Sequence, residues 1–138
     1  MPKQQKIISI ISAFYNESDS LAKFINTFDK TRILLLNKGY KVNLVLVNDG
    51  STDSSVHIVK KIMKNKKYIR LISLTKNYGQ QIAIFTGFQK IESDFYGAID
   101  SDGQQDPKYF IQMLRNLEHN KCDIVQMRKK YGNYEGWF

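Results

Sequence analysis

Short apolar runs alternate along the chain with longer stretches in which apolar and polar positions mix. Four of these runs, at 7–13, 42–47, 68–74 and 95–100, are rich in β-branched and aromatic residues. Such near-continuous apolar runs predict strands that are covered on both faces of a sheet. A fifth run, 122–127, predicts one more strand and makes Cys122 a small buried apolar residue.

Helical periodicity fills the intervals between these runs. Leu21, Phe24, Ile25 and Phe28 fall at i, i+3, i+4 and i+7, which predicts a helix with one apolar face that stops near Gly39. Three further helices are expected, and their inward positions are Val56, Val59, Ile62 and Met63 in the first, Ile82, Phe85 and Phe88 in the second, and Phe110, Ile111, Leu114 and Leu117 in the third. In the second of these, small Ala83 and Gly87 predict close packing.

Strands that alternate with helices predict parallel β-α-β units with right-handed crossovers. The expected fold class is therefore α/β, with a mostly parallel sheet and helices on both faces. In such open sheets, ligands bind outside the carboxyl ends of the strands.

Composition is that of a soluble globular protein with a single domain of 138 residues, 42% hydrophobic and 25% charged. No apolar run approaches the roughly eighteen residues of a membrane span, and the polar start is not that of a signal peptide. Cys122 is the only cysteine, which suits a reducing compartment. A cytoplasmic location is expected.

The net charge of +8 is concentrated in two basic clusters, at 60–70 and 128–130. The clusters are either solvated surface or a region attracted to an anionic layer such as lipid headgroups, which would allow peripheral membrane association. The sequence has no zinc-finger spacing, basic zipper or aromatic RNA-binding signature. Nucleic acid is therefore not expected as a partner.

Two carboxylates, Asp100 and Asp102, follow the fourth predicted strand one residue apart. Mg²⁺ and Mn²⁺ prefer oxygen ligands, and Mg²⁺ usually takes only one or two protein carboxylates. Gln104 adds an amide oxygen within reach. The pair is either a cation site or simply the polar start of a loop.

Other polar side chains also follow predicted strands, so the fold would gather all of them at one edge: Glu17, Asp49, Asn77, Asp100 and Asp102. Several carboxylates at one site repel one another unless a cation or hydrogen-bond donors compensate. A cation could then hold a diphosphate, while Asp49 and Glu17 accept hydrogen bonds from a base or a ribose hydroxyl. This combination indicates a nucleotide-sugar site.

Four segments carry a resemblance to a known family: Ala13-Phe-Tyr-Asn-Glu17, Val47-Asn-Asp-Gly-Ser-Thr-Asp53, Lys76-Asn-Tyr-Gly-Gln80 and Asp100-Ser-Asp-Gly-Gln104. In this order they resemble the inverting family 2 glycosyltransferases with the GT-A fold. The resemblance is closest to the polyprenyl-phosphate branch, which includes dolichyl-phosphate mannose synthase and bacterial undecaprenyl-phosphate sugar transferases. It extends to about Met127 and implies a role in cell-envelope polysaccharide synthesis.

The resemblance implies roles for particular residues. Those expected at the nucleoside and donor pocket are Ala13, Tyr15, Glu17, Asp49, Gly50, Lys76, Asn77, Gly79 and Ser101. Those expected to bind Mg²⁺ or Mn²⁺ are Asp100, Asp102 and Gln104. The implied donor is a UDP-sugar or GDP-sugar, and the implied acceptor is polyprenyl phosphate or a saccharide. Two positions depart from the family pattern, since Ala13 replaces a proline and Gly103 replaces an apolar residue.

Family members continue well beyond 138 residues, into a region that supplies acceptor contacts and, in many relatives, a general base. Residues 1–138 are therefore expected to form a single donor-binding domain, truncated at the C-terminus, with no identifiable catalytic base. One alternative is a nucleotide-sugar-binding remnant without turnover. Another is a phospho-receiver domain, whose third strand ends in an acceptor Asp, whereas the third run here ends in Leu74-Thr75-Lys76.

Overall fold

A computed structural model describes residues 4–120 and 122–127. Strands and helices alternate along them in the order β1 (Ile7–Phe14), α1 (Leu21–Asn37), β2 (Lys41–Asn48), α2 (Ser55–Met63), β3 (Ile69–Ser73), α3 (Gln80–Gln89), β4 (Phe95–Ala98) and α4 (Tyr109–Asn120). The chain as far as Lys108 forms one compact unit, and α4 belongs to a second. The first four predicted strands and the four predicted helices are confirmed, but β4 is not the buried strand that the sequence predicts, because Tyr96 on it is 43% exposed.

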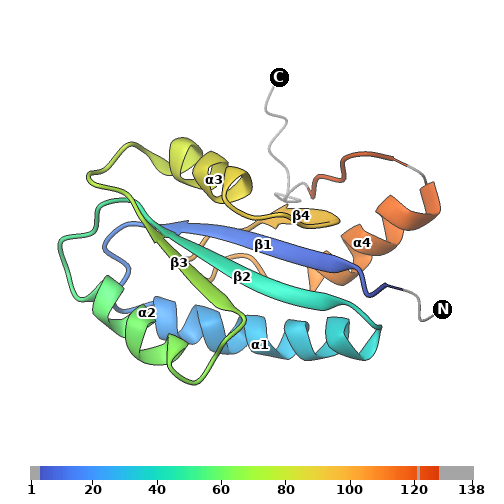
Figure 1. Ribbon diagram of the computed structural model, residues 1–138, viewed down its shortest axis with the longest axis horizontal. Helices are drawn as coiled ribbons and strands as arrows, with labels where there is room; N and C mark the ends of the chain where they lie inside the picture. Colours follow the sequence, from blue (N-terminus) through green and yellow to red (C-terminus); the bar gives the residue numbers. More distant parts are fainter. Residues whose placement is uncertain (1–3, 121, 128–138) are drawn as a thin grey trace, which may run out of the picture. The chain divides into compact units, whose positions relative to one another are not determined.

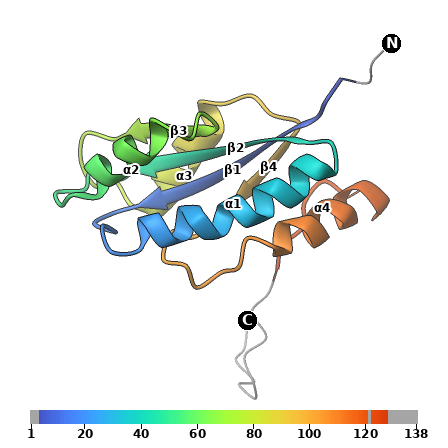
Figure 2. The same cartoon turned by 90° about the horizontal axis from the view of Figure 1, so that it is seen from below.

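The sheet is entirely parallel, with strand order β3-β2-β1-β4. Figure 1 shows α1 and α2 on one face of the sheet and α3 on the other. In the view from below, α1 and α2 lie in front of the strands (Figure 2). The predicted α/β class, with a parallel sheet covered on both faces, is therefore correct.

The direction of strand addition reverses next to β1. The chain adds β2 and then β3 on one side of β1, and after α3 it adds β4 on the other side. The carboxyl ends of β1 and β4 therefore flank a topological switch point, which is where open α/β sheets bind ligands. A phospho-receiver has the order 2-1-3-4-5, so the strand order excludes that alternative.

The core is built around the two central strands, where seven successive residues of each are buried. On one face, α1 contributes the fully buried side chains of Phe24, Ile25 and Phe28. On the other face, α3 approaches so closely that a Cβ on Gly87 would lie 2.6 Å from Cγ2 of Ile11. Small residues therefore bring α3 onto the sheet, as the sequence predicts.

Two other predictions are wrong. Residues 122–127 are not a strand, and both Cys122 and Ile124 are exposed, Ile124 by 84%. High β-propensity alone does not make a strand, because a strand needs a hydrogen-bonded partner. Ile82 and Phe85 are also exposed, because α3 turns Ala83 and Gly87 toward the sheet instead.

None of the helices within 4–120 and 122–127 has the length and apolar content to span a bilayer. The basic cluster at 128–130 lies outside the described residues.

Candidate functional site

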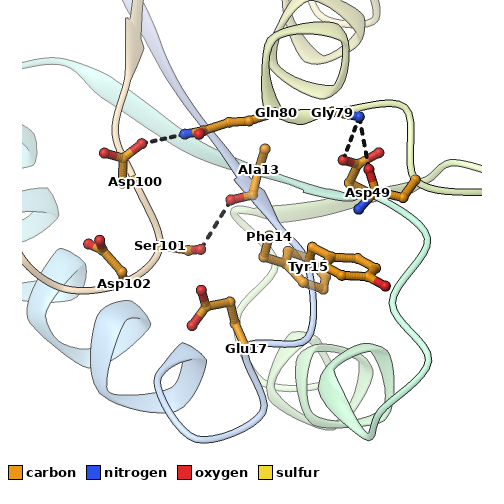
Figure 3. Close-up of a pocket in the computed structure, with 11 residues that line it drawn as sticks. Ala13, Phe14, Tyr15, Glu17, Asp49, Gly79, Gln80, Asp100, Ser101 and Asp102 are labelled. Atoms are coloured by element: carbon orange, nitrogen blue, oxygen red, sulfur yellow. Dashed lines mark hydrogen bonds between the residues drawn. The ribbon is translucent and has the colours of Figure 1, made fainter.

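A pocket of about 350 Å³ lies at the carboxyl ends of the strands, within the first unit (Figure 3). Its lining residues are Ala13, Phe14, Tyr15, Glu17, Asp49, Asn77, Gly79, Gln80, Asp100, Ser101 and Asp102. They come from the end of β1, from the segments that follow each of the four strands, and from the start of α3. The pocket therefore occupies the edge that the strand order marks for ligand binding.

All the predicted site residues except Gly50, Lys76 and Gln104 line this pocket. The expected convergence is confirmed, because Asp49 and Asp102 share one cavity although 53 positions separate them in the sequence. Figure 3 shows Asp100 and Asp102 on one side of the cavity and Asp49 on the other.

Asn16 joins the loop after β1 to the loop after β2. Its Oδ1 accepts hydrogen bonds from the backbone N–H groups of Thr52 (2.8 Å) and Asp53 (3.3 Å). In return, the Asn16 backbone N–H donates to Oγ of Ser51 at 3.0 Å. Asn16 has a positive φ of 52°, a conformation that asparagine tolerates better than most residues. The Tyr-Asn-Glu and Gly-Ser-Thr-Asp segments thus hold each other in place.

Asp53 and Ser55 add to this connection. The Asp53 carboxylate accepts hydrogen bonds from the backbone N–H groups of Ser55 (2.9 Å) and Ser18 (3.2 Å), and the Ser55 hydroxyl accepts one from the Glu17 backbone at 2.9 Å. These hydrogen bonds, chiefly those with Ser55, lower the pKa of the Asp53 carboxyl because they favour its charged form.

Asp49 joins the loop after β2 to the loop before α3. It is only 3% exposed, and its two oxygens accept the backbone N–H groups of Tyr78 (2.8 Å) and Gly79 (3.0 Å). The positive end of the α3 dipole also favours a carboxylate there. The buried charge is therefore compensated by amide donors.

The close approach of the loop after β2 to the loop before α3 requires glycine at position 50. Gly50 has a φ of +75°, and a Cβ at this position would lie 2.4 Å from the carbonyl carbon of Lys76 and 2.6 Å from the nitrogen of Asn77. Those are backbone atoms, which cannot rotate out of the way. Gly50 is outside the pocket lining, and its part in the site is to let two loops touch.

The acidic loop after β4 is fastened to its neighbours by side chains. The buried Ser101 donates its hydroxyl to the Ala13 carbonyl at 3.0 Å, so the loop is attached to the end of β1. Asp100 accepts hydrogen bonds from the side-chain amides of Gln80 (2.5 Å) and Gln105 (2.7 Å). Its carboxylate therefore has a defined orientation.

The donor set suits a hard divalent cation. Asp100 and Asp102 both line the pocket, and both are oxygen donors. No group of three or more His, Cys, Asp or Glu residues within the described ranges could hold a metal. Mg²⁺ usually takes only one or two protein carboxylates and keeps water and substrate phosphate as its other ligands.

Gln104 does not line the pocket, and its backbone N–H donates to Oδ1 of Asp102 at 2.9 Å. Within this loop, the side-chain amide that donates to Asp100 belongs to the next residue, Gln105. The role of Gln104 as a ligand stays a prediction.

Glu17 and Tyr15 complete the floor of the pocket as drawn in Figure 3. Oε2 of Glu17 accepts a hydrogen bond from the Ser20 hydroxyl at 2.5 Å, and Tyr15 is 45% exposed. An accessible aromatic face can stack a nucleoside base, and a carboxylate beside it can accept hydrogen bonds from that base.

Sequence reasoning missed two lining residues, Phe14 and Gln80. Phe14 is the last residue of β1, and Gln80 is the first residue of α3. Position supplies the signal that could have identified Gln80, because the first turn of a helix that follows a strand faces the same edge as the strand's end.

A parallel α/β sheet with a pocket at its switch point is an architecture that many nucleotide-binding proteins use. The family model of Glycosyl transferase family 2 matches residues 9–138, and the chain belongs to this family.

Solved structures agree on the fold. S. aureus TarS is 22% identical with a TM-score of 0.72, over 94% of this chain and 23% of that chain. TarS 1-349 in complex with UDP-GlcNAc is 20% identical with a TM-score of 0.69, over 94% and 37%. The mannosyltransferase PcManGT from Pyrobaculum calidifontis, in complex with GDP-Man and Mn²⁺, is 17% identical with a TM-score of 0.65, over 80% and 31%. The fold is thus GT-A, and the chain spans well under half the length of these structures.

Proposed function

We propose that this chain is the donor-binding part of a glycosyltransferase. It binds a nucleoside-diphosphate sugar together with a divalent cation, and the whole enzyme transfers the sugar with inversion to an acceptor. The observation that carries this proposal is the pocket itself, in which a family 2 chain gathers carboxylates from separate loops at the switch point of its sheet. The ligands of the similar structures, UDP-GlcNAc in one and GDP-Man with Mn²⁺ in another, support a nucleotide-sugar donor.

The nucleoside lies on the side of the pocket formed by Tyr15, Glu17 and Asp49. Each Asp49 oxygen has one backbone N–H partner, so each retains a second lone pair that can accept an N–H from uracil or guanine. Because backbone amides fix this carboxylate, it presents its free lone pairs without further ordering.

The diphosphate lies on the side formed by Asp100 and Asp102, which would hold the cation. When bound, a divalent cation neutralises negative charge on a diphosphate leaving group. Ser101 keeps both carboxylates at the pocket by fastening their loop to β1. Asn77 and Gly79 also line the donor pocket.

The acceptor is polyprenyl phosphate, and the protein works at the cytoplasmic face of a membrane. The sequence contains no acidic residue between Asp53 and Glu92, and exposed lysines of α2 and the loop after it lie in that interval. Such a surface is attracted to anionic headgroups. Cosedimentation with phosphatidylglycerol vesicles but not with phosphatidylcholine vesicles is expected, and equal recovery in both would contradict this part of the proposal.

Isothermal titration calorimetry with UDP and GDP, each with and without Mn²⁺, tests the main proposal. One nucleotide should bind, and Mn²⁺ should raise its affinity by about tenfold or more, equivalent to about 1.4 kcal/mol. Asp102→Asn should remove most of the Mn²⁺ effect, and because Asp102 is exposed the fold should be unaffected. No binding of either nucleotide under any of these conditions would refute the proposal.

Turnover is a separate question, because a remnant could bind the donor without reacting. An assay of sugar transfer distinguishes an enzyme from such a binding remnant. It uses the full-length protein and measures transfer from a radiolabelled UDP-sugar or GDP-sugar to undecaprenyl phosphate.

A further inference from the structure

One carboxylate of the pocket is held by two neutral amides from different elements. Nε2 of Gln80 donates to Oδ1 of Asp100 at 2.5 Å, and Nε2 of Gln105 donates to Oδ2 at 2.7 Å. Figure 3 shows the first of these hydrogen bonds extending across the edge of the pocket from α3 to the acidic loop. Both oxygens of Asp100 therefore have a fixed partner.

The Gln105 amide is oriented by a second hydrogen bond, since its Oε1 accepts the Asp100 backbone N–H at 3.4 Å. Gln105 therefore contacts both the backbone and the side chain of Asp100 within the same loop. The Gln80 contact is different in kind, because it joins Asp100 to the start of another element.

The chemistry of these partners matters as much as their position. Within residues 4–120 and 122–127, no Lys or Arg forms an ion pair with Asp100. An amide donor restrains a carboxylate but leaves its full negative charge, whereas an ammonium group would restrain it and also cancel that charge. A carboxylate that is oriented and still anionic is the better ligand for a cation.

Gln80 also occupies a central place between the two sides of the pocket. It directly follows Tyr78 and Gly79, whose backbone N–H groups bind Asp49, and its own side chain binds Asp100. The start of α3 therefore contacts both the carboxylate assigned to the nucleoside and a carboxylate assigned to the cation.

We propose that Gln80 is a positioning residue for the cation: its neutral amide orients the Asp100 carboxylate without reducing that carboxylate's charge. This inference rests on the proposed function. It predicts that Gln80 affects cation affinity and the cation-dependent part of nucleotide affinity more strongly than it affects cation-free nucleotide affinity.

The test uses Gln80→Met and Gln80→Lys in the 138-residue chain. Methionine has similar length but no donor, and lysine keeps a donor but adds a positive charge. Gln81→Met is the matched control, because Gln81 is the next residue of the same helix, is exposed and does not line the pocket.

Mn²⁺ is titrated into each variant in the presence of UDP or GDP, whichever the unmodified chain binds, and free Mn²⁺ is measured by electron paramagnetic resonance. Loss of an outer partner of a metal ligand typically weakens metal binding by about 10- to 100-fold. Gln80→Met and Gln80→Lys should both lose about tenfold, and Gln81→Met should stay within about twofold. Calorimetry without Mn²⁺ should give Gln81→Met the nucleotide affinity of the unmodified chain, and the loss in Gln80→Met should be smaller without Mn²⁺ than with it.

The outcomes separate the two proposals. If the unmodified chain binds neither Mn²⁺ nor nucleotide, the proposed function fails, and this inference fails with it. If the unmodified chain binds both and Gln80→Met matches Gln81→Met, only the positioning role is overturned. Wild-type Mn²⁺ affinity in Gln80→Lys would likewise refute the requirement for a neutral donor.

Discussion

Replacement of Gly50 by alanine tests the contact between two loops of the pocket. A non-glycine residue in the left-handed region costs about 1–2 kcal/mol. The new Cβ would also lie within 2.8 Å of three backbone atoms of Lys76 and Asn77, and crowding of this kind costs a further 1–3 kcal/mol or so. We expect Gly50→Ala to lower the free energy of unfolding by about 2–5 kcal/mol, a large part of the 5–15 kcal/mol or so that is typical of a domain.

Gly103→Ala is the matched control for this substitution. Gly103 has nearly the same φ, +77°, but a Cβ there would have no neighbour within 4 Å. Its cost should be the backbone term alone, about 1–2 kcal/mol. Urea unfolding followed by far-ultraviolet circular dichroism gives both values. Equal losses in the two variants would show that the loops separate without cost and that the packing argument is wrong.

Three further outcomes follow from the structure. Asp49→Asn turns an amide N–H₂ toward backbone donors, so it should lower the free energy of unfolding by about 1–3 kcal/mol. Chemical denaturation measures this loss, and an unchanged midpoint would contradict it. Ser101→Ala leaves the Ala13 carbonyl without this donor and should cost about 1 kcal/mol, seen as a lower melting temperature, whereas an unchanged melting temperature would mean that another donor replaces the hydroxyl. Burial, together with the hydrogen bond to Asp29, raises the pKa of Tyr68, so the unfolded chain loses this proton first and stability should fall as pH rises above about 10. In Tyr68→Phe that decline should be shallower, and an identical pH profile in denaturation experiments would contradict the assignment.

The central strands and α1 could be predicted from the sequence because burial determines their residues almost position by position. β1 and β2 are covered on both faces, so they carry apolar runs, and the apolar side of α1 follows helical periodicity. In these elements, the apolar positions along the sequence are the positions that the fold buries.

The same reasoning fails where a contact depends on something distant in the chain. Ile82 and Phe85 are as apolar as core residues, but the approach of α3 to the sheet is decided by Gly87 against Ile11. Residues 122–127 have the composition of a strand, yet the ladders of the described sheet do not include them.

The site was predictable as a set of loops but not as a set of contacts. Parallel strands bring their carboxyl ends together, which is why Asp49 and Asp102 could be expected in one place. The hydrogen bonds that Asn16 accepts from the 52–53 backbone and that Gln80 donates to Asp100 join residues 20 or more positions apart, and no local pattern encodes them.

The hydrogen bonds of Asn16, Asp49, Gln80 and Ser101 connect the loops after β1, β2, β3 and β4, each to the next, and the last of them connects back to the end of β1. The conformational entropy of these loops is therefore lost when the protein folds, and little of that cost remains for the moment of binding. A ligand meets a cavity whose shape is already set, so discrimination among ligands rests on fit to a rigid template.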